Sequence, residues 1–265
     1  MARRKKEGCE SLVSFNSRTG MICRHDIKES LRGRVTGFTL TEMLVVMLVL
    51  ALLAALLLPS LSKARAKAHS VLCLNNVKQW SLAFWMYGDD HEDFFPYEGN
   101  PSDINSGLNL NAWYNSATEY VSQPKLKDLY LQGRPPVPGV RSIFVCPRTQ
   151  NTPPAKLTVA NAFFMYGFNN RMDPNGEIRF RRSQVLQPAE TVLFTENSED
   201  RFPSTSGRFT PARHSHRANL GFVDGHAEGV HQKDFRRTAL EDGDARAEWS
   251  QPRKVYWYPY PGAPN

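Results

Sequence analysis

The chain has 265 residues and a formal net charge of +7, from 33 lysines and arginines against 26 aspartates and glutamates. Residues 1–37 hold 9 of these basic and 4 of these acidic side chains, which leaves 24 against 22 in the remainder, or +2. This near-neutral remainder argues against nucleic acid as a partner. Its length allows one globular domain of roughly 150–175 residues beside a membrane helix.

The most informative stretch runs from Gly37 to Leu61. Residues 43–58 form an unbroken apolar run, which with its flanks is long enough to cross a hydrocarbon layer of about 30 Å as a helix. Glu42 is the single charge and stands at the start of the run. A charge within a spanning helix costs about 2.5–3.5 kcal/mol on insertion scales, so a plain anchor would tend not to carry one.

This arrangement of Gly37, Phe38, Glu42 and an apolar run resembles the class III leader of type IV pilins and type II secretion pseudopilins. The resemblance implies that a prepilin peptidase cuts between Gly37 and Phe38 and that the new Phe38 nitrogen is methylated. It also implies that Glu42 is the assembly carboxylate, paired with the α-amino group of a neighbouring subunit. Pro59 corresponds to the helix-kinking proline that many pilins carry.

The resemblance also implies a location and a set of partners. We expect a single-pass inner-membrane protein with a cytoplasmic N-terminus, held there by the basic leader at residues 1–37, and a periplasmic globular domain. The partners are the inner membrane, prepilin peptidase, other pseudopilin subunits in a homo- or hetero-filament, and the assembly platform of a secretion system. Whether translation starts at Met1 or Met21 stays open.

Two other interpretations of the apolar run compete with this one. The first is a plain N-terminal anchor without processing. The second is a secretory signal peptide, because Ala64-Arg65-Ala66 and Ala66-Lys67-Ala68 are A-x-A sites behind an apolar segment. The run is longer than the usual core of a signal peptide, and Lys63, Arg65 and Lys67 crowd the cut, which argues against the second interpretation.

After the spanning helix at residues 38–61, the pattern predicts an amphipathic continuation over 62–88 that restarts after Pro59 and ends near Gly88. Its apolar positions, spaced mostly by three or four, include Ala64, Ala68, Val71, Leu72, Val77, Trp80 and Phe84. We interpret Trp80, Phe84 and Trp85 as the stripe on which the globular domain packs. Residues 73–79, CLNNVKQ, resemble a stretch of pseudopilin-like proteins of planctomycetes and verrucomicrobia.

Residues 89–235 are predicted to form a globular domain with a small antiparallel β-sheet and long loops. The long N-terminal helix is expected to pack on this sheet, which gives an α+β fold. The predicted elements are a short helix at 117–131, strands at 143–146, 163–169, 178–181 and 191–195, and a hairpin at 218–230. Asp224-Gly225 predicts a type I′ turn in that hairpin. The C-terminal tail, residues 236–265, is polar apart from an aromatic cluster at 256–259 that we expect to dock on the domain.

Four cysteines are present. Cys9 and Cys23 would leave with the leader, and Cys73 and Cys146 would remain as an even pair in an oxidising compartment. We predict that they form a disulfide, which would close a loop of some seventy residues and contribute about 4 kcal/mol by loop entropy. The alternative is two buried free thiols. No CxxC or Cys/His spacing suggests a zinc site.

A histidine-rich segment follows. His214, nine further residues and then Asp224-Gly225 resemble the H-X9-DG motif of C-terminal domains associated with prepilin processing. We interpret His214 as a structural residue that bonds the backbone or Asp224 and fixes the hairpin. The alternative is a metal site, with calcium near Asp224 or zinc held by His214, His216, Asp224 and His226.

No catalytic residue is predicted, because the sequence has no Ser-His-Asp elbow, HExxH motif or glycine-rich phosphate loop. Cys146 with a histidine is an alternative thiol nucleophile. Its position at the end of a predicted strand, before Pro147, is more consistent with one half of a disulfide. We expect a structural protein without enzymatic activity or cofactor: a pseudopilin-like subunit of a type II secretion or type IV pilus-like filament. Alternatives are a DNA-uptake or adhesive pilin, and a membrane-tethered metal-binding protein that uses the cluster between His214 and His231.

Overall fold

The computed structural model describes residues 37–265 except 151, 177, 199 and 200. The predicted leader, with Met21, Cys9 and Cys23, therefore lies outside the described residues apart from Gly37. The chain divides after Leu56 into two units. The N-terminal part of the first helix and the compact unit Leu57–Asn265 are therefore described separately.

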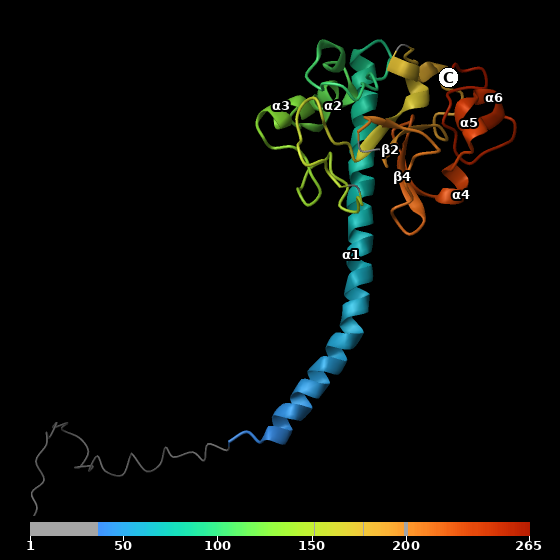
Figure 1. Cartoon of the computed structure of the whole chain (residues 1–265). Helices are drawn as coiled ribbons and strands as arrows, with labels where there is room; N and C mark the ends of the chain where they lie inside the picture. The colour runs from blue at the N-terminus through green and yellow to red at the C-terminus, as the bar shows by residue number, and fades with distance from the viewer. Residues whose placement is uncertain (1–36, 151, 177, 199–200) are drawn as a thin grey trace, which may run out of the picture. The chain divides into compact units, whose positions relative to one another are not determined.

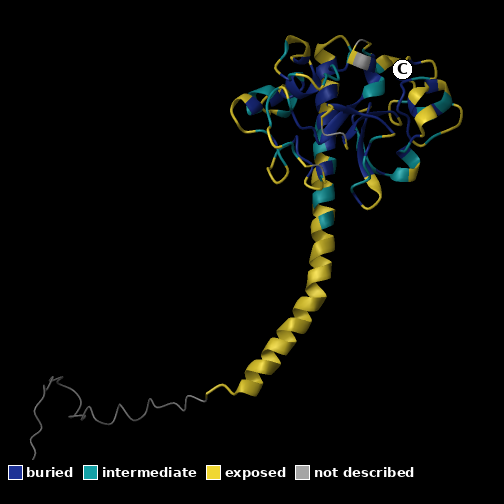
Figure 2. Cartoon of the chain, viewed as in Figure 1, coloured by how far each residue is buried: buried dark blue, intermediate teal, exposed yellow. Residues whose placement is uncertain are grey.

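Helix α1 runs from Leu40 to Asp90 without interruption. It is long and apolar enough to cross a membrane, and its apolar N-terminal part is exposed throughout in the isolated chain (Figure 2). The restart predicted after Pro59 is not needed, because the helix continues through this proline. Pro59 has no N–H to donate to the preceding turn, and the Ser60 hydroxyl binds the nearby Leu57 carbonyl at 2.8 Å.

The C-terminal part of α1 is the central element of the compact unit. Its buried face consists of Cys73, Val77, Trp80, Ser81, Ala83, Phe84, Tyr87 and Gly88. This face has the predicted helical spacing but begins later than expected, since Val71 and Leu72 remain 58 % and 50 % exposed. Trp85 is half-exposed, and its indole N–H donates to the Val223 carbonyl at 2.6 Å.

The strands form one five-stranded sheet in the order β3-β1-β2-β4-β5. Its strands are β1 (Tyr166–Asn169), β2 (Val192–Glu196), β3 (Ser204–Thr205), β4 (Arg217–Phe222) and β5 (Ala227–His231). Four of them pair antiparallel, as predicted, whereas the short β3 pairs parallel with β1 and makes the sheet mixed. The predicted α+β class with a long N-terminal helix is confirmed.

Short helices surround this sheet (Figure 1). They are α2 (Trp113–Ser116), α3 (Leu126–Leu131), α4 (Gln232–Phe235), α5 (Ala239–Gly243) and α6 (Ala245–Glu248), with single 3-10 turns at 107–109, 119–121, 170–172, 174–176 and 182–184. In Figure 1, α2 and α3 lie on one side of α1, and β2, β4 and α4–α6 lie on the other.

Two apolar cores cover the two sides of the sheet. The larger one centres on Trp80, whose ring lies 5.0 Å from that of Trp113 and 5.9 Å from that of Phe194 between centroids. The smaller one holds Val192, Ala218, Leu220, Phe222, Val230, Phe235, Val255 and Trp257. The sheet therefore packs on α1 through one face and on the C-terminal tail through the other.

The tail docks as predicted, through its aromatic cluster. Tyr256, Trp257 and Tyr258 are buried, and the Val192 backbone N–H donates to the Tyr256 carbonyl at 2.8 Å. A buried ion pair between Arg237 Nε and Glu248 Oε1, at 2.7 Å, fixes the chain between α4 and this cluster.

Several predicted elements are wrong or displaced. Residues 143–146 form a buried turn instead of a strand, and residues 178–181 contribute only an isolated bridge from Arg181 to Phe94. The helix predicted at 117–131 is only partly helical, with a 3-10 turn at 119–121 and α3 at 126–131, and the strand predicted at 163–169 begins only at Tyr166. Residues 143–146 are buried without forming a strand, because the Trp80 core is lined by loops as well as by strands.

The predicted hairpin is present as β4 and β5, but its turn is not type I′. That turn needs a positive φ at both central residues, and among Asp224 and Gly225 only Gly225 has one, at 89°. The Gly225 N–H donates to the Phe222 carbonyl at 3.0 Å, and the Phe222 N–H donates to the His226 carbonyl at 2.9 Å. This is a four-residue turn followed by a glycine bulge.

Candidate functional site

The segment around the predicted processing site begins α1. Thr39 precedes the helix, and its Oγ1 accepts a hydrogen bond from the Glu42 backbone N–H at 3.3 Å. Glu42 Oε2 in turn accepts from the Thr39 N–H at 2.8 Å and from the Thr39 hydroxyl at 2.7 Å. This reciprocal pattern is a capping box, which satisfies helix N–H groups that otherwise have no partner.

Glu42 therefore has a local structural role that sequence reasoning missed, although the Thr-x-x-Glu spacing of residues 39–42 signals it. Gly37, Phe38 and Glu42 are all exposed in the isolated chain. Their exposure leaves the Phe38 nitrogen and the Glu42 carboxylate accessible to other molecules.

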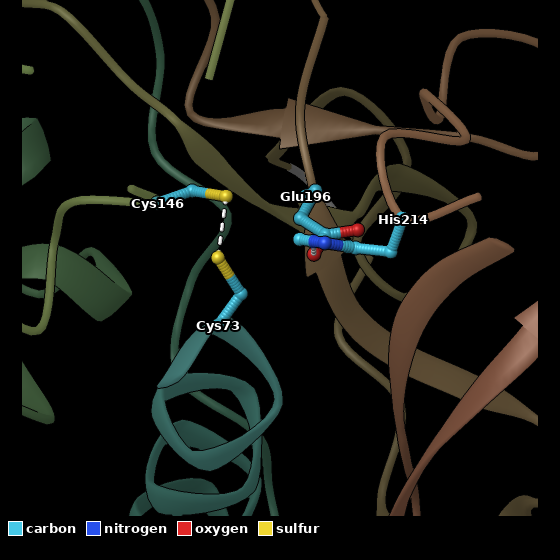
Figure 3. Close-up of side chains that lie close together, drawn as sticks. All are labelled: Cys73, Cys146, Glu196 and His214. Carbon is cyan, nitrogen blue, oxygen red and sulfur yellow. Dashed lines mark hydrogen bonds and ion pairs between the residues drawn. The ribbon is translucent and has the colours of Figure 1, made fainter. Parts of the chain in front are cut away.

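A second group of functional side chains lies inside the compact unit. The ligand atoms of its four residues all lie within 4.8 Å of one another, and all four residues are buried (Figure 3). We call this group the buried cluster; its members are Cys73, Cys146, Glu196 and His214.

Each member comes from a different element. Cys73 stands on the buried face of α1, and Glu196 ends β2. Cys146 ends the buried turn at 143–146, which Asn76 of α1 holds by donating to the Val145 carbonyl at 3.1 Å. His214 precedes β4 in a tight turn, closed by the Arg217 N–H donating to the His214 carbonyl at 3.2 Å.

The two cysteines predicted to pair are brought together. Their sulfurs lie 2.7 Å apart, and both residues are free cysteines in the structure. A covalent disulfide has an S–S distance of about 2.05 Å. The disulfide therefore remains a prediction, while the expected proximity of Cys73 to Cys146 across the interface between α1 and the domain is observed.

His214 does not bond Asp224, so that part of the structural interpretation is wrong. Its Nε2 lies 2.7 Å from Glu196 Oε1, and Asp224 instead accepts from the His226 ring at 2.6 Å. The proposed metal set of His214, His216, Asp224 and His226 is not assembled, because Asp224 and His226 form their own pair in the exposed hairpin turn.

The Glu196 carboxylate is held by further donors. Its Oε1 accepts from Asn219 Nδ2 at 2.8 Å, and its Oε2 accepts from the Asn219 backbone N–H at 2.9 Å. Sequence reasoning gave no role to Asn219. A charged residue directly after the strand predicted at 191–195 was the available signal for this pair.

The pKa values of the buried cluster shift in different directions. The hydrogen bond from Cys73 lowers the pKa of the Cys146 thiol to about 4, and the same contact raises the pKa of Cys73. Burial by itself would lower the pKa of His214, but its interactions with Cys146 and Glu196 outweigh this and raise it to about 9. Burial raises the pKa of Glu196.

His214 also lines a surface cleft. The other lining residues are Lys63, Ala66, Lys67, Ser70, Arg148, Arg213 and Ser215. Four of them are cationic, so the edge of the buried cluster faces a basic opening on the compact unit. Lys63 and Lys67 come from α1, directly after its apolar segment.

The comparisons with known proteins bear on the N-terminal segment. Residues 32–58 match the family model of the prokaryotic N-terminal methylation motif. This match supports a type IV pilin-like or pseudopilin-like protein and covers the predicted cleavage site, Phe38 and Glu42. No curated protein and no solved structure matches the chain.

Proposed function

We propose that this chain is a structural, pseudopilin-like subunit that a prepilin peptidase cleaves after Gly37 and that assembles through α1 into a filament. The observation that carries the proposal is the methylation motif at residues 32–58, placed directly on the start of a long apolar helix. The motif and this helix together support processing by the peptidase and anchoring in a membrane.

The exposure of α1 supports a role in assembly. Large apolar residues of its N-terminal part lie exposed in the isolated chain, for example Met43 at 56 %, Leu50 at 55 % and Leu57 at 64 %. In the membrane lipid covers such a surface, and in a filament the same helices of other subunits would cover it. Glu42 would then pair with the methylated Phe38 nitrogen of a neighbouring subunit. This nitrogen gives the carboxylate a charged partner, which lipid does not provide.

The remaining features of the proposal follow from this role. The compact unit would face the periplasm, and the filament would belong to a type II secretion or type IV pilus-like machine. The protein would act without catalysis. Cys73 and Cys146 would form a disulfide when the exported domain is oxidised, joining α1 to the turn that precedes Pro147.

The position of the cleavage site tests the proposal. In cells that contain prepilin peptidase, Gly37→Leu should abolish processing, and Gly37→Ala should have a milder effect. Gly243→Leu is a matched control, because Gly243 is exposed with open space around it and lies far along the chain. Cleavage of the Gly37→Leu chain at the same rate as the control would contradict the proposed junction.

A further inference from the structure

The buried cluster combines two thiols, one imidazole and one carboxylate, a combination that structural zinc sites use. Zinc prefers four nitrogen, sulfur or oxygen ligands in a tetrahedron, and thiolate ligands disfavour calcium and magnesium. All four residues are inaccessible or nearly so, with exposed fractions of 0 % for Cys73, Cys146 and Glu196 and 7 % for His214. We propose that the buried cluster binds one zinc ion when its two cysteines are reduced.

The spacing of the ligand atoms suits such a site. Zn–S and Zn–N distances of about 2.3 and 2.0–2.1 Å place the ligands of a tetrahedral site about 3.2–3.8 Å from one another. The four ligand atoms lie within 4.8 Å of one another. The two closest pairs, Cys73 with Cys146 and Glu196 with His214, are each 2.7 Å apart and would open by about 1 Å around the ion.

Outer contacts hold these ligands in place. Asn219 binds both oxygens of Glu196 through its side chain and its backbone N–H, and its Nδ2 also lies 3.4 Å from the Ser70 carbonyl of α1. The Asn76 side chain donates to the Val145 carbonyl at 3.1 Å and so holds the residue before Cys146. Such partners orient metal ligands and fix their charge.

The basic cleft lies next to a site that would carry a negative charge. Two thiolates, one carboxylate and a neutral imidazole around Zn²⁺ carry a net charge of about −1. Lys63, Lys67, Arg148 and Arg213 line the cleft that reaches His214, so cationic groups stand next to this negative centre. The bound ion would connect α1, the turn before Pro147, the end of β2 and the turn before β4.

Zinc and a disulfide are alternative states of the same two sulfurs. The disulfide takes up both sulfurs and leaves only His214 and Glu196, which already bond each other. Zinc uses all four members. His214 offers two ring nitrogens as ligands: Nε2, which lies next to Glu196, and Nδ1, which is buried without a hydrogen-bond partner. The reduced protein is therefore the form in which the complete cluster has a ligand.

The experiment measures zinc and thiols in the full-length chain, purified in detergent. The protein is reduced, the reductant is removed without oxygen, and zinc is titrated against a chromophoric chelator. We expect about one zinc ion per chain, together with loss of two reactive thiols. Replacement by Co²⁺ should give the near-ultraviolet charge-transfer band of a cobalt thiolate and the intense visible bands of tetrahedral cobalt.

Variants assign the ligands. Cys73→Ser and His214→Gln should each lose the stoichiometric binding, whereas the exposed control His226→Gln should retain it. Asn219→Ala removes one hydrogen bond to Glu196 and should weaken zinc binding by about 10–100-fold without removing the cobalt thiolate band. This variant separates loss of the site from a failure to fold.

Two results would overturn the proposal. One is a reduced wild-type chain that takes up no zinc and shows no cobalt thiolate band. The other is binding that persists in Cys73→Ser, which would place the ion elsewhere. Neither result depends on processing at Gly37, so failure of the zinc site and failure of the filament proposal remain distinguishable.

Discussion

The Glu42 carboxylate accepts hydrogen bonds from both the backbone N–H and the hydroxyl of Thr39, at 2.8 and 2.7 Å. The same side chain that resembles the assembly carboxylate of pilins thus also caps its own helix. The two roles differ in what they need, because a cap requires only a hydrogen-bond acceptor whereas pairing with an α-amino group requires a charge.

Glu42→Gln separates these roles. Glutamine can accept the same hydrogen bonds from Thr39 and so preserves the capping box, but it carries no charge. We expect normal cleavage and membrane insertion with filament assembly reduced at least about tenfold, equivalent to about 1.4 kcal/mol. Quantification of sheared or cross-linked filaments against total processed protein measures this.

Thr39→Val is the matched control. It removes the hydroxyl from the cap at a cost of about 1 kcal/mol at the end of the helix and leaves the carboxylate in place. Assembly should therefore stay close to that of the wild type. An assembly defect in Thr39→Val that equals the defect in Glu42→Gln would assign the role of Glu42 to the cap.

The contact between α1 and β4 is closest at Gly221. A Cβ atom at this position would lie 2.0 Å from Ser81 Oγ and 3.0 Å from Val77 Cγ1. Gly221→Ala should lower the free energy of unfolding by about 1–3 kcal/mol, because the buried helix face cannot accept the extra carbon without moving. Denaturant unfolding of the full-length chain in detergent measures the loss.

The geometry also predicts a partial rescue. Ser81→Ala removes the closest atom, so the double variant Ser81→Ala/Gly221→Ala should be more stable than Gly221→Ala alone. Gly229→Ala is the matched control in the same hairpin, since a Cβ atom there would meet its nearest neighbour at 3.6 Å. Equal losses in Gly221→Ala and Gly229→Ala would contradict the proposed close approach.

Glu98 makes stability depend on pH. Burial raises the pKa of its carboxyl to about 8, although the Ser204 hydroxyl donates to its Oε1 at 2.5 Å. In the unfolded chain a glutamate titrates near pH 4.3. Between these two values the folded protein binds more protons than the unfolded one, so its stability falls as the pH rises.

Glu98→Gln should remove much of this fall, because glutamine stays neutral and still accepts from Ser204. The unfolding free energy of the wild type should decrease from about pH 5 to about pH 8, and the variant should show a flatter dependence. The remaining slope reflects groups such as Asp173, whose pKa burial raises to about 6. Exposed Glu119→Gln is the control, and a wild-type slope in both variants would contradict the role of Glu98.

The sequence was sufficient to predict the elements with strong local patterns. The apolar run with Glu42, the amphipathic spacing through Trp80 and Phe84, and the strand at 191–195 each carry a signal of their own. The structure places them as α1 and β2. The hairpin was predictable for the same reason, although the type of its turn depends on backbone angles that the Asp224-Gly225 pair alone does not determine.

The buried turn at 143–146 could not be predicted in this way. Ile143, Phe144 and Val145 have the composition of a strand, but their burial comes from Trp80 and the loops around it. The decisive contacts are long-range, such as the hydrogen bond from Trp80 Nε1 to the Ile143 carbonyl at 3.3 Å. The local periodicity of a sequence does not indicate a contact between two residues that are 63 positions apart.

The buried cluster was only partly predictable. The even number of cysteines after the predicted leader indicated that Cys73 and Cys146 would meet, and the structure places them together. That His214 would join Glu196 instead of Asp224 follows from the order of strands, since β2 lies next to β4 in the sheet. Ligand spacing in the sequence gave no sign of a site whose members come from four separate elements.

The most direct test of the central claim is the N-terminal residue and its mass in protein isolated from its native membrane. Processing by a prepilin peptidase predicts a chain that begins at Phe38 and carries one methyl group on its α-amino nitrogen. An N-terminus at Met1 or Met21 would contradict processing and leave a plain anchored protein. An N-terminus at Lys67 or His69 would show that a signal peptidase had removed the apolar helix, which contradicts assembly through α1.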